Sequence, residues 1–146
     1  MEAQPSFEAL HSLLRAELSA LETYRHVLAK ADNPALAVPV KKILEDHRES
    51  ATMLGAQIEE SGGDPHQPAS TWKNIDLLAA ELSRNPLRDP VALKALLEGE
   101  EQDELTYEGV LHREELDRDS REMVERMLLP RTRAHISALE RLLCAM

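Results

Sequence analysis

The chain has 146 residues, of which 42% are hydrophobic and 30% are charged, and its formal net charge is −10. This size and composition predict one globular domain over residues 1–146 and argue against a disordered chain. The acidic excess disfavours nucleic acid and anionic membranes as partners, because phosphate binding needs a basic surface. Only four residues are aromatic and five are glycine, which disfavours an all-β fold.

The sequence carries no signal for a membrane or for export. It has no apolar run of membrane-spanning length, and its first residues lack the basic flank and apolar core of a signal peptide. A cytoplasmic location is therefore expected. Cys144 is the only cysteine, so an internal disulfide is excluded.

The first half of the chain contains two segments with the apolar periodicity of helices. One is expected from about Ser6, acting as N-cap, to Ala31. The other runs from about Pro34 to Ser61, where the pair beginning at Gly62 stops it. The short link between them predicts an antiparallel helical hairpin.

A long connection follows, from Gly62 to about Arg88, and Trp72 to Leu82 within it is expected to be a short helix. Two further helices come after this crossover. The layout of hairpin, long crossover and hairpin predicts an all-α four-helix bundle.

The third helix is expected to open with Asp89 as its N-cap and to run to about Leu116. A fourth helix then continues to about Ala145. Asp119 is its predicted N-cap, in a capping box with Glu122. Pro130 lies inside this fourth helix and predicts a kink.

The two predicted hairpins share an internal repeat. The pattern E-x5-T-Y-x2-V-L begins at Glu17 and again at Glu100, 83 residues later, and it includes the only tyrosines, Tyr24 and Tyr107. Heptad-like spacing extends each copy into a stripe that should face the core. On the first helix the stripe is Leu10, Leu14, Glu17, Leu21, Tyr24 and Leu28. On the third it is Leu93, Leu97, Glu100, Glu104, Tyr107 and Leu111.

The second and fourth helices repeat each other at an offset of 88 residues. Their stripes are Val40, Leu44, His47, Ala51, Leu54 and Ile58, and Leu128, Thr132, His135, Leu139, Leu142 and Met146. Each helix of the bundle therefore carries a strongly polar residue near its middle, in a slot that should be apolar. These residues are Glu17, His47, Glu100 and His135.

Burying two carboxylates without compensation would cost several kcal/mol each. A divalent iron, zinc or manganese ion would compensate them, because Glu and His are suitable ligands for these metals. Protonated histidines would do so as well, through a Glu–His hydrogen-bond cluster that the tyrosine hydroxyls could complete. The sequence leaves both alternatives open.

Other polar residues near these slots are expected on the surface. Four acidic neighbours lie off the stripes and predict a solvated face: Glu45, Asp46, Glu98 and Glu101. Four histidines have no counterpart in the repeat and are likewise assigned to the surface: His11, His26, His66 and His112.

The sequence resembles the ferritin-like superfamily. A Glu followed seven residues later by a Tyr in each hairpin, with a His on the partner helix, is similar to ferritin-like and distantly rubrerythrin-like bundles. LLRAELSALETYRHVL, DHRESATML, GGDP, LLEGEEQDELTY and LLPRTRAHI resemble a family of small bacterial ferritin-like proteins of unknown function. The resemblance implies two antiparallel hairpins joined by a crossover, and self-association as a homodimer.

The chain departs from the di-iron pattern of that superfamily, in which two helices carry Glu-x-x-His. Leu44 and Thr132 stand where these glutamates would be. The ligands carried over are Glu17, His47, Glu100 and His135, with Glu104 as a possible fifth. Di-iron oxidase, peroxidase or ferroxidase chemistry needs both ions, so enzymatic activity is not expected.

Two functional hypotheses follow. One is a ferritin-like protein whose reduced Glu/His site binds one metal ion. The other is a metal-free helical bundle that serves as a structural, stress-related or protein-interaction module. No small-molecule substrate is indicated by either the motifs or their spacing.

Overall fold

The computed structural model describes residues 4–30, 33–64 and 89–146, with the side chains of residues 4–6 and 89 left aside. These residues are helical apart from turns, and they contain no strand. Helix α1 spans Gln4–Lys30 and α2 spans Pro34–Glu60. Helix α4 spans Asp89–His112. The last helical stretch consists of α5 (Arg118–Met123), the π-helical segment η1 (Val124–Leu128) and α6 (Leu129–Cys144). The all-α prediction is confirmed.

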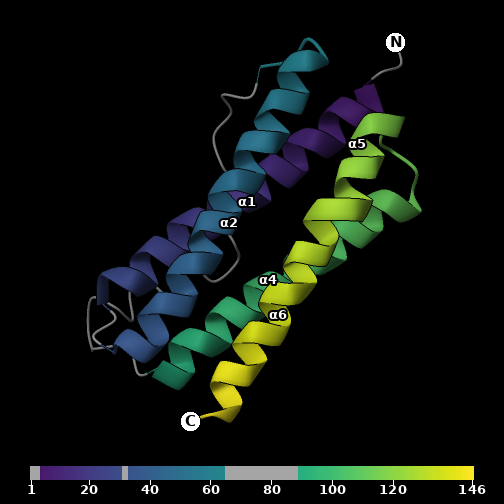
Figure 1. Cartoon of the computed structure of the whole chain (residues 1–146). Coiled ribbons are helices and arrows are strands. Elements are labelled where there is room, and N and C mark those ends of the chain that lie inside the picture. Colours follow the sequence, from purple (N-terminus) through teal and green to yellow (C-terminus); the bar gives the residue numbers. More distant parts are fainter. Residues whose placement is uncertain (1–3, 31–32, 65–88) are drawn as a thin grey trace.

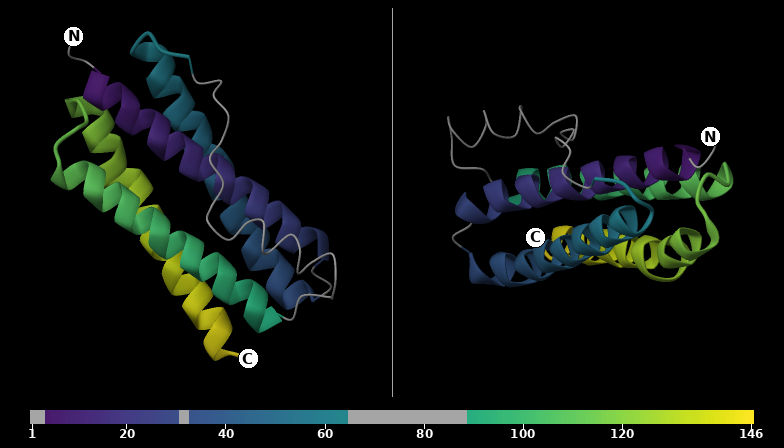
Figure 2. Two further views of the ribbon diagram at one scale, coloured as in Figure 1. Left: turned by 180° about the vertical axis from the view of Figure 1, so that it is seen from behind. Right: turned by 90° about the horizontal axis from the view of Figure 1, so that it is seen from above.

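The helices are arranged in two pairs, each formed by neighbours in the sequence (Figure 1). Helix α1 packs along α2, and α4 packs along α6. Seen from behind and from above, α1 and α4 lie on one face of the bundle and α2 and α6 on the opposite face (Figure 2). Each helix therefore turns one side toward a shared core. The predicted helix at Trp72 to Leu82 lies outside the described residues.

Helix α2 has clear signals at both ends, and the prediction for it is confirmed. The side chain of Asn33 accepts a hydrogen bond from the backbone N–H of Ala35 at 3.0 Å, which caps the first turn. At the other end Gly62 has φ +88°, and the N–H of Gly63 bonds the carbonyl of Ile58. This is the geometry of a Schellman motif, in which glycine is favoured at the left-handed position.

Helix α1 begins before its predicted N-cap. It starts at Gln4, so Ser6 lies inside the helix and the N-cap prediction at that residue is wrong. The physical reason is Pro5. Proline is tolerated in the first turn because the N–H that it lacks would have no helical partner there.

Helix α4 ends at His112, four residues before the predicted end at Leu116. Glu114 has φ +54°, and its N–H bonds the carbonyl of Leu111. The N–H of the next residue, Glu115, bonds the carbonyl of Val110. The motif that ends α2 is thus repeated at the end of α4, with a glutamate at the left-handed position. The sequence does not predict this end, because no glycine marks it.

The start of α5 also differs from the prediction. Asp117, not Asp119, is the N-cap, and its Oδ1 accepts a hydrogen bond from the N–H of Ser120 at 2.8 Å. Because the helix begins two residues earlier, Ser120 occupies the position that Glu122 was expected to hold. The predicted capping box is therefore not formed.

A π-helical turn lies next to Pro130, the residue at which the sequence predicts a kink. The helix widens into a π-turn at Val124–Leu128, and the N–H of Leu129 bonds the carbonyl of Val124, five residues back. Pro130 follows directly, in the first turn of α6. Proline cannot donate to the carbonyl four residues before it, and a π-turn is one way for a helix to accommodate that missing bond.

The core is formed by buried positions that repeat between α1 and α4. On α1 they include Leu10, Leu13, Glu17, Ala20, Tyr24 and Val27, and on α4 Leu93, Leu96, Glu100, Asp103, Tyr107 and Val110. Each pair is 83 residues apart, so the predicted repeat is present in the packing. The core line on α4 nevertheless differs from the expected one. Leu96, Asp103 and Val110 are buried, whereas the expected Leu97, Glu104 and Leu111 are only partly buried.

None of the helices in the described ranges is long and apolar enough to cross a membrane.

Candidate metal centre

The four polar residues predicted for the core lie inside it. Glu17 is 2% exposed, His47 1%, Glu100 0% and His135 4%. They come from α1, α2, α4 and α6, so every long helix contributes one side chain. We refer to Glu17, His47, Glu100 and His135 as the core cluster.

His47 lies between the two glutamates. Its Nδ1 is 2.6 Å from Oε1 of Glu17, and its Nε2 is 2.5 Å from Oε2 of Glu100. One imidazole thus joins a carboxylate of its own helix pair, α1 and α2, to a carboxylate of the other pair, α4 and α6. The second histidine, His135, reaches only one of the glutamates, with Nδ1 3.2 Å from Oε1 of Glu100.

The tyrosines cross between the two helix pairs. Tyr24 of α1 donates its hydroxyl hydrogen to Oε2 of Glu100 on α4 at 2.6 Å. Tyr107 of α4 donates to Oε2 of Glu17 on α1. The tyrosine of each repeat therefore donates a hydrogen bond to the glutamate of the other repeat. These two bonds connect the α1–α2 pair with the α4–α6 pair.

The charges of the core cluster are strongly coupled. Burial by itself would lower the pKa of His47, but the negative charges of Glu100 and Glu17 hold that pKa well above its ordinary value. Burial by itself would raise the pKa of Glu100, but the charge of His47 and hydrogen bonds from both histidines hold it well below its usual range. Without a metal ion, His47 is therefore a cation that lies between the side chains of Glu17 and Glu100.

The two phenols remain donors. Burial, followed by the charge of Glu100, raises the pKa of Tyr24 well above its ordinary value. Burial and the charge of Glu17 do the same for the pKa of Tyr107. Both hydroxyls therefore stay protonated at neutral pH and neutralise no charge.

Glu104, the possible fifth ligand, does not lie with the core cluster. It is 28% exposed, and its Oε2 pairs with Nε of Arg133 at 2.9 Å on the outside of α4 and α6. Arg133 also pairs with Glu108 at 2.7 Å. These contacts join α4 to α6 on the surface rather than in the core.

Asp103 occupies the core position that was expected for its neighbour. It is 1% exposed and lies one turn after Glu100 on α4. Its counterpart on α1 is Ala20, so the glutamate and tyrosine of the repeat do not indicate a polar residue at this position. A sequence signal for Asp103 does exist. Leu13 matches Leu96 and Val27 matches Val110 in the repeat, and a buried face drawn through these apolar pairs also passes through position 103.

Asp46 was assigned to a solvated face, but it is only partly exposed and contacts the core cluster. Its side chain is 34% exposed, and Oδ2 lies 2.9 Å from Nε2 of His135. The residue precedes His47 on α2 but turns toward α6, where Arg131 also bonds its carbonyl oxygen at 3.4 Å. Sequence spacing along α2 gives no sign of this contact, because the partner belongs to another helix.

The other surface assignments have mixed outcomes. Glu45, Glu98, Glu101, His26 and His112 are exposed as expected, and His66 lies outside the described residues. His11 is buried, and its ring contacts the ring of Phe7 edge-on with centroids 4.6 Å apart. The surface assignment of His11 is therefore wrong, because its turn of α1 is covered on that side.

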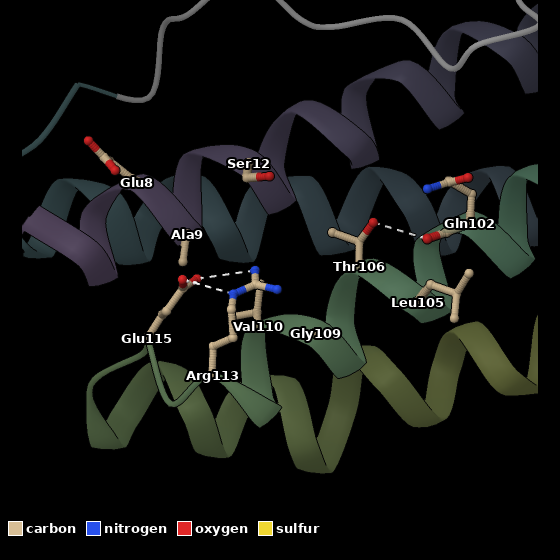
Figure 3. A pocket seen from close by; sticks show the side chains of 10 residues that line it. All are labelled: Glu8, Ala9, Ser12, Gln102, Leu105, Thr106, Gly109, Val110, Arg113 and Glu115. Carbon is tan, nitrogen blue, oxygen red and sulfur yellow. Dashed lines mark hydrogen bonds and ion pairs between the residues drawn. The ribbon is translucent and has the colours of Figure 1, made fainter.

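A separate groove of about 600 Å³ lies between α1 and α4 (Figure 3). It is lined by Glu8, Ala9, Ser12, Gln102, Leu105, Thr106, Gly109, Val110, Arg113 and Glu115. Arg113 and Glu115 pair across one end at 2.9 Å. No member of the core cluster lines the groove, so it is distinct from the candidate site.

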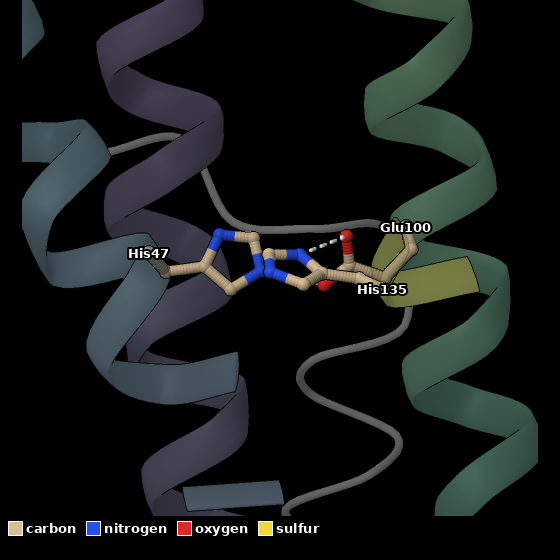
Figure 4. A group of neighbouring side chains, drawn as sticks. All are labelled: His47, Glu100 and His135. Carbon is tan, nitrogen blue, oxygen red and sulfur yellow. Dashed lines mark hydrogen bonds and ion pairs between the residues drawn. The ribbon is translucent and has the colours of Figure 1, made fainter. Parts of the chain in front are cut away.

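The described residues include side chains placed so that they could hold a metal ion. Two sets of three buried side chains bring one ligand atom each to within 4.8 Å of one another: His47, Glu100 and His135, and Glu17, His47 and Asp103. The first set is drawn in Figure 4, where the two imidazoles and the carboxylate converge from three helices. Nitrogen and oxygen donors of this kind suit zinc, iron and manganese.

Comparison with known proteins adds no relative: no protein family, curated protein or solved structure matches the chain.

Proposed function

We propose that the chain is a ferritin-like four-helix-bundle protein whose core cluster binds one divalent metal ion. The fold part of this proposal is supported by the close packing of α1 with α2 and of α4 with α6. It is also supported by the core positions that recur at an offset of 83 residues. In this arrangement the two helix pairs are antiparallel hairpins joined by the segment between α2 and α4.

The observation that carries metal binding is the convergence of the core cluster. Two carboxylates and two imidazoles from four helices are no more than 4% exposed, and contacts of 2.5, 2.6 and 3.2 Å join them. Moving such groups out of water is costly unless opposite charge accompanies them. A divalent cation supplies that charge and has the ligand preferences of these side chains.

The proposed role is binding rather than oxygen activation. Leu44 and Thr132 fill the positions of the two carboxylates that would complete a di-iron site, and both are buried in the core. When bound, the ion would supply a positive charge and a Lewis acid to the core. The residues of the chain itself hold and orient the ligands.

Metal analysis of the purified full chain tests the proposal. We expect about one zinc, iron or manganese ion per chain, in keeping with a single compact site. The Glu100→Gln variant should lose the ion. The Glu104→Gln variant is the matched control, because it makes the same change one turn away on the surface and should keep the ion.

A second candidate function is favoured by the hydrogen bonds of the core cluster. Each carboxylate oxygen of Glu17 and Glu100 already faces a donor from His47, His135, Tyr24 or Tyr107. A closed network of this kind can fix the register of the helices without an ion. The chain would then be a metal-free structural or protein-interaction module.

Adding metal to chelator-treated protein separates the two functions. An ion that binds only the folded chain should add about 4 kcal/mol of stability at a thousandfold excess over its dissociation constant. An unchanged melting temperature with zinc, iron(II) and manganese(II) would reject metal binding and favour the metal-free module.

We further propose that the chain forms a homodimer, by resemblance to small ferritin-like bundles. Sedimentation or light scattering at micromolar concentration should give twice the chain mass of 16.4 kDa. A mass of 16.4 kDa would reject the dimer.

A further inference from the structure

Among the described residues, the core offers two positions for an ion, and both use the same histidine. One is formed by His47, Glu100 and His135, and the other by Glu17, His47 and Asp103. All five side chains are buried. The two positions differ in composition, because the first has two imidazoles and one carboxylate and the second has one imidazole and two carboxylates.

The shared histidine faces the two positions with different ring nitrogens. Nε2 of His47 lies 2.5 Å from Oε2 of Glu100, and Nδ1 lies 2.6 Å from Oε1 of Glu17. A neutral imidazole has one lone pair for a metal and one N–H for a hydrogen bond. His47 can therefore serve only one position at a time, and its N–H remains directed at the carboxylate of the other.

The second histidine is oriented for the first position. Nε2 of His135 lies 2.9 Å from Oδ2 of Asp46, and a carboxylate only accepts hydrogen bonds. The Nε2 atom of His135 therefore carries a hydrogen directed at Asp46. Nδ1, which donates to Glu100 in the metal-free chain, is the ring nitrogen that would give up its hydrogen and offer a lone pair when an ion binds. That nitrogen lies 3.2 Å from Oε1 of Glu100, on the inner side of the core.

On this basis, and resting on the proposed metal binding, we infer that the ion is held by Nε2 of His47, the carboxylate of Glu100 and Nδ1 of His135. Glu17 and Asp46 are then positioning residues. Each accepts a hydrogen bond from the ring nitrogen that does not bind the ion, which fixes the orientation of a ligating histidine.

The ligand set also selects the class of ion. Two imidazoles and one carboxylate suit zinc and iron(II), which accept nitrogen donors, better than magnesium or calcium, which prefer oxygen. The site is therefore expected to discriminate strongly between zinc and magnesium.

Zinc and cobalt titrations of chelator-treated full-length chain test this assignment. His135→Asn should lower zinc affinity by more than about 100-fold, whereas Asp103→Asn should change it by less than about threefold, because only the first residue is a ligand in the assigned position. Asp46→Asn should lower the affinity by about 10- to 100-fold, as expected for a positioning carboxylate. Glu104→Gln is the surface control and should bind like wild type.

The cobalt spectrum distinguishes ligands from positioning residues. Glu17→Gln and Asp46→Asn should weaken binding but keep the visible absorption bands of the wild-type cobalt complex, because the ligating atoms are unchanged. Asp46 is partly exposed, so this variant reports on the assignment even if His135→Asn does not fold.

The outcomes are distinct for the two proposals. If the wild-type chain binds neither zinc nor cobalt, the proposed function and this assignment both fail. If the wild type binds zinc but Asp103→Asn abolishes binding while His135→Asn and Asp46→Asn do not, only the assignment fails. Two tightly bound ions per chain would also overturn it, since His47 would then have to serve both positions together.

Discussion

Replacement of Glu100 by glutamine in the metal-free chain isolates the contribution of the buried charge. The carboxylate faces His47 at 2.5 Å, Tyr24 at 2.6 Å and His135 at 3.2 Å, and the residue is fully buried. Glutamine has nearly the same shape, so packing is preserved. The change removes the negative charge and puts a donor where one of the two acceptors stood.

The expected loss follows from the partners that remain. Hydrogen bonds to a charged group contribute about 1.5–3 kcal/mol each, but they share one acceptor and do not add. The imidazolium of His47 keeps Glu17 as its partner, so the protein is left with a partly compensated buried charge. Breaking a buried ion pair in this way costs about 3–5 kcal/mol. For a chain of this size that corresponds to a decrease of roughly 6–20 °C in melting temperature.

Urea unfolding, followed by circular dichroism in the presence of a chelator at mildly acidic pH, measures this loss. Glu104→Gln provides the matched control, because Glu104 is paired with Arg133 on the surface and its replacement should cost no more than about 1 kcal/mol. Equal losses of less than about 1 kcal/mol in both variants would refute the reasoning. They would mean that Glu100 carries no compensated charge in the folded core.

Three further predictions concern the caps, the packing and the pH dependence of the metal-free chain. Asp117→Ala should lower the free energy of unfolding by about 1 kcal/mol, because Asp117 caps α5. Asp119→Ala should lower it by clearly less, and equal losses in urea melts would contradict the assigned cap. Gly63→Ala should lower the free energy of unfolding in the same assay, because an added Cβ would lie 1.7 Å from a ring carbon of Phe7. A variant as stable as wild type would show that Phe7 does not pack against Gly63. The raised pKa of His47 stabilises the fold fully below its unfolded value of about 6.5, and this contribution is lost as the pH rises through the folded value. The lowered pKa of Glu100 stabilises the fold above its unfolded value of about 4.3 and is lost as the pH falls through the folded value, so stability from this pair should be greatest between those limits. Urea melts across this range should show that maximum, and a profile that His47→Gln leaves unchanged would contradict the assignment.

The sequence alone determined the helices and the polar residues in their apolar slots. Both are local properties, because the spacing of apolar residues along a helix fixes which side can be buried. Glu17, His47, Glu100 and His135 interrupt that spacing, and all four are in the core. The repeat between the two halves of the sequence strengthened the prediction, since the same exception occurs twice at matching positions.

The tertiary structure decided which of two adjacent residues on α4 faces the core. Spacings of three and four residues both fit a helix, so the pattern around Glu100 allows either Asp103 or Glu104 on the buried side. The rotation of α4 against α1 and α6 selects Asp103, which is 1% exposed, and leaves Glu104 at 28%. That rotation depends on the neighbouring helices and is not encoded in the spacing along α4.

The ends of the helices show the same division. Gly62 marks the end of α2 in the sequence, because glycine adopts a left-handed conformation at little cost. Glu114 ends α4 in the same conformation without any such signal. The contact between Asp46 and His135 joins residues 89 positions apart, on α2 and α6. Periodicity predicts which side of each helix is buried, whereas only the packing of the four helices determines which adjacent residue faces the core and which buried side chains meet.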